Sequence, residues 1–399
     1  MGLLGAGGAV DFAKAAPYNE KQNSGPGAPS APADVNFLKG QVSNMGDTDK
    51  RWEQLAASIV NYSFKMKPGE KMMIAMHEIE TYPLALAVYG EVVKAGGYAQ
   101  IQFVSEAMKH KVLKYGTDQQ ISWVPEVEAF GMDWADYYLG LRGAFNLDEC
   151  YDIPSEKVAM YQKAMGVISA DRWKKTKWAL VRVPNEHFAQ QAHVSYEKIM
   201  EMFFNACTLD WEAYVKQWQR VCDIFDKGSH LHLTGHKTDF EFDYGGNKWT
   251  VMDNTTNIPD GEFYVTPKWN TVKGHIFFEF PATLGGRVIN DLSLEFKDGE
   301  VCKADASTNL DYVNMILDCT PNARRVGEFA FGTNPYVDIC TTDILIDEKI
   351  MGSMHMALGR PYDAAYQCPI HWDIVKDTRK DAEVTIDGKL VFKDGKFLV

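Results

Sequence analysis

The chain has 399 residues, a formal net charge of −13, a hydrophobic fraction of 46% and a charged fraction of 24%. These fractions are typical of a globular protein, and the length favours two domains with a large core over a single domain. The negative charge and the lack of any Lys/Arg block longer than Lys174-Lys175 argue against a nucleic-acid-binding groove. No apolar run reaches the roughly 18 residues of a transmembrane helix, so we expect no membrane span and no membrane partner.

Residues 1–45 differ from the rest of the chain, being rich first in Gly and Ala and then in Ser and Pro. Such a segment cannot bury enough apolar surface to fold by itself, so we predict a flexible arm that could lie along a partner subunit. It lacks the basic region with which a secretory signal peptide begins. The seven cysteines are an odd number without a Cys-x-x-Cys pair, which indicates reduced thiols and a cytoplasmic location.

Residues 46–225 are predicted to form an α/β domain. Strands are expected at 71–76, 99–104 and 178–183, and helical patterns lie between them. Strands that alternate with helices indicate βαβ units and a parallel sheet. The domain has no phosphate-binding loop, so we expect it to shape and cover a site rather than to bind a nucleotide.

The end of this domain, residues 195–227, is predicted to be helical and to bridge the two domains. Apolar and aromatic residues recur there at helical spacing, Asp210 is a suitable cap, and Gly228 follows the last turn.

Residues 226–399 are predicted to form a β-rich α+β domain that holds a metal site. Three Asp-Gly pairs, at 298–299, 387–388 and 394–395, are strong hairpin turns between short β-forming runs. His230 and His232 lie two apart in one such run and imitate a metal-binding pair, but we interpret them as core or surface histidines. The predicted fold class is therefore α/β, with an N-terminal parallel-sheet domain before the metal-binding domain.

His371 and Asp373 form a His-x-Asp step beside β-forming residues. Side chains two residues apart share one face of a strand, so both could bind one ion. Imidazole and carboxylate together suit zinc, manganese, cobalt or iron. The alternative is a structural His–Asp pair, the commoner outcome when the pattern stands alone. His355, Glu348 and Tyr362 lie nearby in sequence and favour the metal.

Two upstream glutamates, Glu262 and Glu328, each follow a glycine and are flanked by aromatic residues. A carboxylate among apolar residues must be paired, protonated or bound to a metal, because an unpaired buried charge is very costly. The alternative at each position is a turn that ends in an ordinary half-exposed glutamate.

Four motifs in order, NIPDGEFYVTP, GEFAFGTNP, DEKIMGSMHMALGRPY and IHWDIV, resemble the aminopeptidase T / aminopeptidase S family of metallopeptidases. Similar segments extend the resemblance to residues 50–380. It implies two divalent metal ions, zinc, cobalt or manganese, a number that also follows because so many ligands exceed the needs of one ion. The ligands it implies are Glu262, Glu328, Glu348, His355, His371 and Asp373.

The resemblance further implies an aminopeptidase in which a metal-bridged hydroxide removes the N-terminal residue of a peptide. Glu328 and Asp373 are the implied bridging ligands, and Glu348 is implied as a ligand or a catalytic carboxylate. Tyr362 is implied as a donor to the oxyanion, its alternative being a packed aromatic beside Pro361. The expected substrate is a peptide or small molecule with a free amino group, and we expect a homodimer.

The sequence departs from the aminopeptidase T pattern between Tyr362 and His371, where only the letters DAAYQCPI connect the two. A short connection is also found in the 2,5-dihydroxypyridine dioxygenases, which resemble this family but use one iron and a reduced ligand set. A mononuclear, ring-cleaving dioxygenase is therefore the second hypothesis. The presence of Glu262, Glu328 and His355 favours two metals and hydrolysis over it.

Overall fold

A computed structural model describes residues 49–399 except 144, 145, 147 and 363–365. The predicted arm, residues 1–45, lies outside the described residues. No helix in the described part of the chain is long and apolar enough to cross a membrane. The predicted fold class is confirmed, since a parallel sheet forms from the first half of the chain and antiparallel sheets from the second. The exact limits of the two predicted domains remain a prediction.

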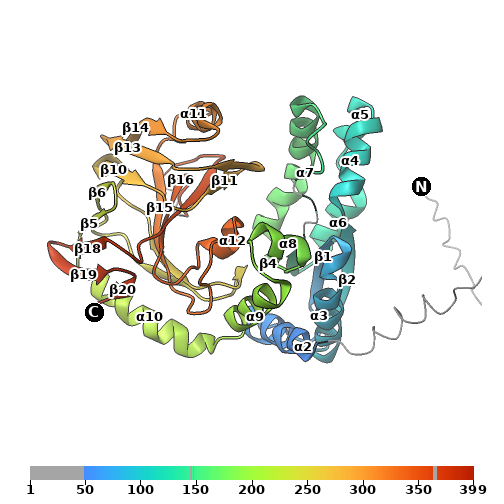
Figure 1. Ribbon diagram of the computed structural model, residues 1–399. Helices are drawn as coiled ribbons and strands as arrows, with labels where there is room; N and C mark the ends of the chain where they lie inside the picture. Colours follow the sequence, from blue (N-terminus) through green and yellow to red (C-terminus); the bar gives the residue numbers. More distant parts are fainter. Residues whose placement is uncertain (1–48, 144–145, 147, 363–365) are drawn as a thin grey trace, which may run out of the picture. The chain divides into compact units, whose positions relative to one another are not determined.

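The α/β lobe, as we call the part built on the parallel sheet, contains five strands with helices on both faces (Figure 1). In sheet order the strands are β2 (Tyr98–Val104), β1 (Lys71–His77), β3 (Tyr137–Arg142), β4 (Lys177–Arg182) and β8 (Asn257–Ile258). All neighbours are parallel. The three strands predicted here are confirmed to within one residue at each end. The fourth and fifth members, β3 and β8, were not predicted.

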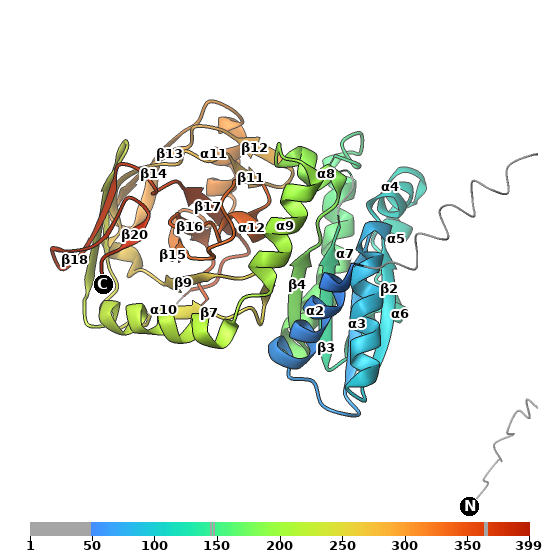
Figure 2. The same ribbon diagram turned by 60° about the horizontal axis from the view of Figure 1, so that its bottom comes forward.

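The helices of this lobe pack on the two faces of the sheet according to the alternation of its side chains. They are α2 (Lys50–Ala57), α3 (Tyr82–Lys94), α4 (Glu106–Tyr115), α5 (Asp118–Ile121), α6 (Glu126–Trp134), α7 (Ser155–Lys175), α8 (Glu186–Gln191) and α9 (Tyr196–Cys207). Ile74 and Leu139 point to the face covered by α2, α3 and α9. Met73 and Tyr138, their neighbours in sequence, point to the face covered by α6 and α7. Figure 2 shows the helices standing on either side of the strands.

The β lobe, as we call the rest of the described chain, has two large antiparallel sheets around one aromatic core. The eight-stranded sheet has the order β14 (Glu300–Asp305), β13 (Ser293–Lys297), β10 (Lys273–Phe277), β6 (Thr238–Asp243), β5 (His230–Gly235), β18 (Ala382–Ile386), β19 (Lys389–Lys393) and β20 (Lys396–Phe397). The five-stranded sheet, which we call the site sheet, has the order β17 (His371–Lys376), β16 (Met354–Gly359), β15 (Val326–Gly332), β9 (Glu262–Val265) and β7 (Thr250–Met252). The remaining elements are the hairpin of β11 (Ala282–Leu284) and β12 (Arg287–Ile289), and helices α10 (Trp211–Phe225), α11 (Leu310–Asp318) and α12 (Ile344–Asp347).

All three predicted Asp-Gly hairpin turns are confirmed. They connect β13 to β14, β18 to β19 and β19 to β20, and both residues of each pair have positive φ. Two successive residues with positive φ are what a type I′ turn requires, and Asp-Gly tolerates that backbone better than most pairs.

The predicted helical region 195–227 consists of two helices, α9 and α10, rather than one. The hydroxyl of Thr208 donates to the carbonyl of Phe204 at the end of α9, and the Asp210 carboxylate accepts from the Ala213 amide at the start of α10. These side chains satisfy the free backbone groups at the break. The buried side chains of α9 belong to the core of the α/β lobe, and those of α10 to the core of the β lobe.

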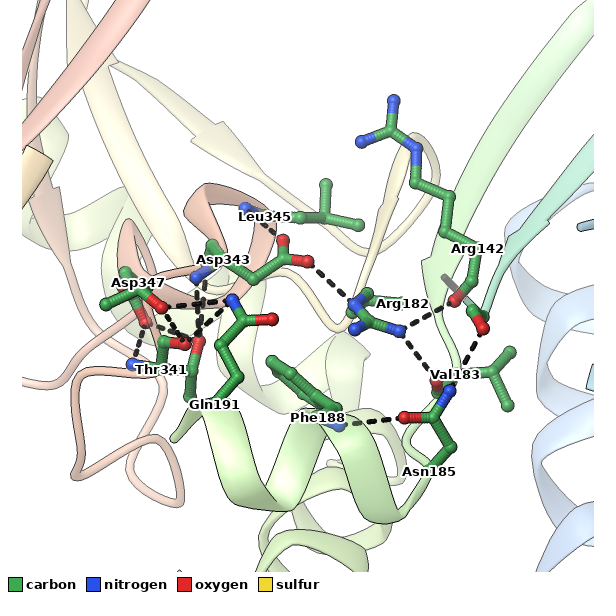
Figure 3. Close-up of polar contacts among 12 residues, drawn as sticks. Arg142, Arg182, Val183, Asn185, Phe188, Gln191, Thr341, Asp343, Leu345 and Asp347 are labelled. Carbon is green, nitrogen blue, oxygen red and sulfur yellow. Dashed lines mark hydrogen bonds and ion pairs between the residues drawn. The ribbon is translucent and has the colours of Figure 1, made fainter. Parts of the chain in front are cut away.

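A buried ion pair also connects the lobes. Arg182, at the end of β4, is 2% exposed, and its Nε donates to the Asp343 carboxylate over 2.7 Å (Figure 3). Asp343 in turn caps α12 by accepting from the Leu345 amide. The guanidinium also donates to the carbonyls of Arg142 and Val183, so it is held from both lobes.

Candidate metal centre

One face of the site sheet carries most of the predicted ligands. In the strand register Glu262 is opposite Gly332, His355 is opposite Ala330, and Asp373 is opposite Ala357. Opposed residues and residues two apart share a face, so Glu262, Glu328, His355, His371 and Asp373 all point to the same side. The alternate residues, including Phe263, Phe329, Met356 and Trp372, point into the aromatic core.

Gly261 and Gly327 precede the two glutamates at positions where another segment of the chain packs so closely that a side chain would not fit. Gly261 has φ +129°, and a Cβ at this position would lie 2.6 Å from the Cβ of Asn334. A Cβ at Gly327 would lie 2.7 Å from the backbone of Arg360. Neither position could accept a side chain without movement of the backbone, so the two glycines fix where Glu262 and Glu328 enter the site.

The side chains converge on short distances. The Nε2 atom of His355 lies 3.3 Å from Glu262 Oε2, 3.6 Å from Glu328 Oε1 and 3.8 Å from Glu348 Oε2. The Nε2 atom of His371 lies 3.4 Å from Glu328 Oε2 and 3.2 Å from Asp373 Oδ1. Glu348, which directly follows α12, reaches the site from outside the sheet. All six predicted ligands are therefore brought together, although their role as ligands remains a prediction.

These atoms form three overlapping sets that could each hold an ion. The sets are Glu262, Glu328 and His355; Glu328, His371 and Asp373; and Glu348, His355 and Asp373. Glu328, His355 and Asp373 each belong to two sets. Sharing of this kind is expected where carboxylates bridge two neighbouring ions.

The hydrogen bonding of the cluster is incomplete. Glu262 Oε2, both carboxylate oxygens of Glu328, both ring nitrogens of His355 and Oδ1 of Asp373 are buried and have no hydrogen-bond partner among the described residues, and Glu262 Oε1 has only the Lys349 ammonium, 2.6 Å away. Buried polar atoms in a folded protein are nearly always satisfied, so a group of orphaned acceptors facing one another calls for a ligand. Imidazole nitrogens and carboxylate oxygens are the donors that divalent metals of the zinc, cobalt and manganese type accept, so the residues fit the predicted group.

The backbone fixes the orientation of the His371 imidazole. Its Nδ1 lies 2.7 Å from the carbonyl oxygen of Arg360, and only an N–H can donate there. This leaves the Nε2 lone pair facing Glu328 and Asp373. A backbone carbonyl that fixes the tautomer in this way is the usual partner of a metal-binding histidine.

Sequence reasoning missed two charged residues of the site, Lys349 and Asp260. The Lys349 ammonium is fully buried and lies 2.6 Å from Glu262 Oε1, 3.3 Å from Asp260 Oδ1 and 3.5 Å from Glu348 Oε2. The only feature of the sequence that could have indicated them is their position, since Lys349 directly follows Glu348 and Asp260 lies two residues before Glu262. If the imidazoles are neutral, five carboxylates and one ammonium leave four negative charges, which two divalent ions would balance.

The local charges shift the pKa values in opposite directions. Burial raises the pKa of Glu262 to about 7, although Lys349 and His355 oppose the shift, and burial raises the pKa of Glu348 well above its usual range. Burial also raises the pKa of Glu328, but His355 and His371 outweigh it and lower that pKa overall. Burial lowers the pKa of His355, but the carboxylates, Glu328 first, raise it to about 9. Without ions, the site would therefore take up protons.

Tyr362 lies at the opening of the site. Its ring packs 4.6 Å from that of Tyr264 and 5.5 Å from that of His371, and the residue is 47% exposed. The negative charge of Glu328 raises the pKa of Tyr362 well above its usual range, and burial adds to this, so the phenol stays protonated. A protonated phenol at this place can donate to a bound substrate.

His230 and His232 lie on β5, away from these sets, and pair with carboxylates of β6. His230 Nδ1 is 2.7 Å from Asp243, and His232 Nε2 is 2.8 Å from Asp239. Neither belongs to a group that could hold a metal among the described residues, in agreement with their interpretation as surface histidines.

Comparison with known proteins identifies the family of the chain. Residues 48–397 match the family described as thermophilic metalloprotease (M29). The chain is 22% identical over 359 residues to Aminopeptidase 2 of Geobacillus stearothermophilus, covering 80% of this chain and 85% of that protein. It is 20% identical over 349 residues to Aminopeptidase PepS of Streptococcus thermophilus, covering 78% and 84%.

Two solved structures share the fold. AmpT from Thermus thermophilus superposes with a TM-score of 0.78 at 19% identity, covering 88% of this chain and 99% of that one. The 2,5-dihydroxypyridine dioxygenase from Pseudomonas putida KT2440 superposes with a TM-score of 0.55 at 12% identity, covering 87% and 97%. The family match spans nearly all of the sequence and confirms the predicted resemblance. The chain is therefore a metal-dependent hydrolase that belongs to the M29 family of thermophilic metalloproteases.

Proposed function

We propose that this protein is a two-metal aminopeptidase that removes the N-terminal residue from peptides. The observation that carries the proposal is a cluster of carboxylates and imidazoles, most of them on one face of the site sheet, in which several buried atoms lack a hydrogen-bond partner and three overlapping sets could each hold an ion. We assign Glu262, Glu328, Glu348, His355, His371 and Asp373 as ligands of two divalent ions, zinc, cobalt or manganese.

When bound, the two ions would activate a water molecule for attack on the peptide carbonyl and stabilise the charge that develops on its oxygen. The protein supplies the geometry. Glu328 and Asp373 each belong to two of the possible ligand sets, so these carboxylates would be shared between the two ions. Glu348 directly follows α12 and reaches the site from outside the sheet, so its carboxylate could accept a proton from the attacking water and pass it to the leaving amine. Tyr362 donates to the oxyanion from the open side.

The substrate we propose is a peptide or small molecule with a free amino group. The surplus of carboxylates over cations in the site favours a ligand that brings positive charge or a metal-binding lone pair. The half-exposed Tyr362 leaves the site open on that side. We further propose that the protein acts as a cytoplasmic homodimer, with domains at 46–225 and 226–399 and a flexible arm at 1–45.

Hydrolysis of short peptides tests the proposal. We expect release of N-terminal amino acids, loss of activity with a chelator and recovery with zinc, cobalt or manganese. Glu328→Gln, which keeps the shape of the side chain but removes its charge, should raise the barrier by several kcal/mol. Acetylation of the substrate amino group should abolish cleavage. Equal cleavage of acetylated peptides would contradict the amino-group anchor.

The second hypothesis is a mononuclear iron dioxygenase. It has in its favour the short connection before His371 and the fold shared with the Pseudomonas putida enzyme. Against it stands the number of ligands, because an iron of that type needs two histidines and one carboxylate, whereas three further carboxylates converge here. One tightly bound iron per chain, with oxygen uptake and no peptide cleavage, would decide for the dioxygenase.

A further inference from the structure

A second cavity, of about 240 Å³, lies in the α/β lobe and takes no part in the metal centre. Its floor is the sheet face covered by α6 and α7, near the carboxyl ends of the strands. His77 ends β1 and Arg142 ends β3, and the two are opposite each other in the register. Its lining includes His77, Glu128, Tyr138, Arg142 and Arg172.

The position of this cavity is one where ligands commonly bind. In the strand order β2-β1-β3-β4, the strand that follows β1 in sequence, β2, lies on one side of β1, and the next strand, β3, lies on its other side. In open parallel sheets, the crevice at the carboxyl ends of two such strands is the preferred binding place, because the two connections diverge there. The cavity opens beside β1 and β3, where this divergence occurs.

Two guanidinium groups face this cavity without a carboxylate partner. Neither Arg142 nor Arg172 makes an ion pair in the described part of the chain, although Glu128 lines the same cavity. Arg172 lies 4.8 Å from the ring of Trp178 and 5.5 Å from that of Tyr138, but its buried Nε has no acceptor. Figure 3 shows the Arg142 side chain extending away from the Arg182–Asp343 pair, so only its carbonyl belongs to that network.

The chemistry of the lining selects among anions. Phosphate sites in such folds use a glycine-rich turn and a free helix N-terminus. Here the Glu78 carboxylate already accepts from the Glu106 amide at the start of α4, over 2.6 Å, and the turn after β1 has no glycine. A carboxylate, by contrast, suits the forked donors of arginine. Glu128 lines the same cavity and can accept from an ammonium. Of the other lining residues, Gln102 and Ser169 are polar, and the apolar ones are Val104, Met132, Met165, Ile168 and Leu180.

We propose that this cavity binds a free α-amino acid with an aliphatic side chain, with its carboxylate on Arg142 and Arg172 and its ammonium on Glu128. The proposal does not depend on the peptidase reaction. The backbone carbonyl of Arg142 accepts a hydrogen bond from the Arg182 guanidinium, which also donates to Asp343. Asp343 caps α12, and Glu348 directly follows that helix. The site is therefore connected by two consecutive polar contacts to the helix that positions a predicted metal ligand.

Isothermal titration of the full-length, metal-loaded protein with leucine tests the proposal. Because the metal centre could bind leucine as well, Glu328→Gln serves to separate the two sites, and binding to the cavity should persist in it. Arg142→Ala, at an exposed position that the fold tolerates, should weaken binding at least about tenfold, and Arg172→Met should do the same. Arg220→Ala, an exposed arginine on α10, is the matched control and should change nothing.

Related probes test each half of the ligand. Leucinol lacks the carboxylate and N-acetyl-leucine lacks the ammonium, so both should bind at least about tenfold more weakly than leucine, and Glu128→Gln should remove the preference for leucine over N-acetyl-leucine. Leucine that does not bind to Glu328→Gln, or binds equally to Arg142→Ala and Arg172→Met, would overturn the site. Acetate that binds as tightly as leucine would overturn the assignment to an amino acid.

Discussion

Removal of the metals should make the stability of this protein strongly dependent on pH. In the metal-free protein the pKa of Glu262 is raised from 4.5 to about 7, and that of His355 from 6.5 to about 9. Each raised pKa stabilises the protonated folded state by about 3 kcal/mol. A group whose pKa is higher in the folded state contributes its full stability below the unfolded pKa and loses it as pH rises through the folded pKa. The metal-free protein should therefore lose stability between pH 5 and pH 9.

We expect that loss to be at least about 5 kcal/mol: Glu262 and His355 give somewhat less than their sum because they interact, and two further groups add to the loss. These are His371, for which burial lowers the pKa but Asp373 and Glu328 raise it to about 12, and Glu348, whose pKa burial raises well above its usual range. The metal-loaded protein should not lose stability in this range, since ions hold the same groups deprotonated. Asp347, with a pKa of about 7, contributes equally to both forms and cancels in their difference. The lowered pKa values of Glu328 and Asp373 act below this range, where stability falls as pH falls.

Denaturant unfolding at several pH values, with and without chelator, measures this difference. His355→Asn should flatten the curve of the metal-free protein, and His232→Asn, which removes a surface imidazole, should leave it unchanged. Parallel curves for the two forms, or a metal-free protein whose stability does not depend on pH, would refute the assignment of these residues to a metal centre.

Four further substitutions test other parts of the structure. Lys349→Met should destabilise the metal-free protein by about 3–5 kcal/mol by leaving buried carboxylates unpaired, and the metal-loaded protein by less, as measured by denaturant unfolding. Lys376→Met, which removes a buried ammonium 2.8 Å from Glu279, should cost the same in both forms. Tyr362→Phe should lower kcat by raising the activation barrier by about 2–4 kcal/mol, without changing the metal content; loss of metal would contradict a donor role. Asp343→Asn should weaken metal binding in a chelator competition, because Arg182 then holds α12 less firmly; unchanged affinity would show that α12 is positioned by other contacts.

The parts of the fold that could be predicted from the sequence are those set by local chemistry. The strand at 71–76 was predicted from a short run of apolar residues after a turn, and β1 follows it almost residue for residue. The Asp-Gly turns were predicted because few other pairs accept their backbone angles. The break between α9 and α10 has equally local causes in Thr208 and Asp210, and Asp210 had been identified as a cap.

Contacts between distant parts of the chain could not be predicted in this way. The two residues of β8 extend the parallel sheet from a position 75 or more residues after β4, and nothing in their neighbourhood indicates a partner. Lys349 is a similar case. A lysine is normally exposed, and its burial follows only from Asp260 and Glu262, which a strand elsewhere in the sequence brings to it. The six ligands themselves were identified through the family resemblance, because spacing alone left a structural pair as the alternative.

The site sheet carries two incompatible environments on its two faces, and strand alternation is what allows this. One face contributes phenylalanine and methionine to a dry core, which holds the strands rigidly. The other face places small residues, Ala330, Gly332 and Ala357, opposite the long acidic and imidazole side chains. These small residues offer the cluster no polar partner, and the one ammonium beside it, that of Lys349, cannot satisfy all of its buried carboxylates. In the metal centre that we propose, bound cations would supply the free energy that other buried polar groups obtain from hydrogen bonds, so the arrangement that makes the metal-free fold costly would favour metal binding.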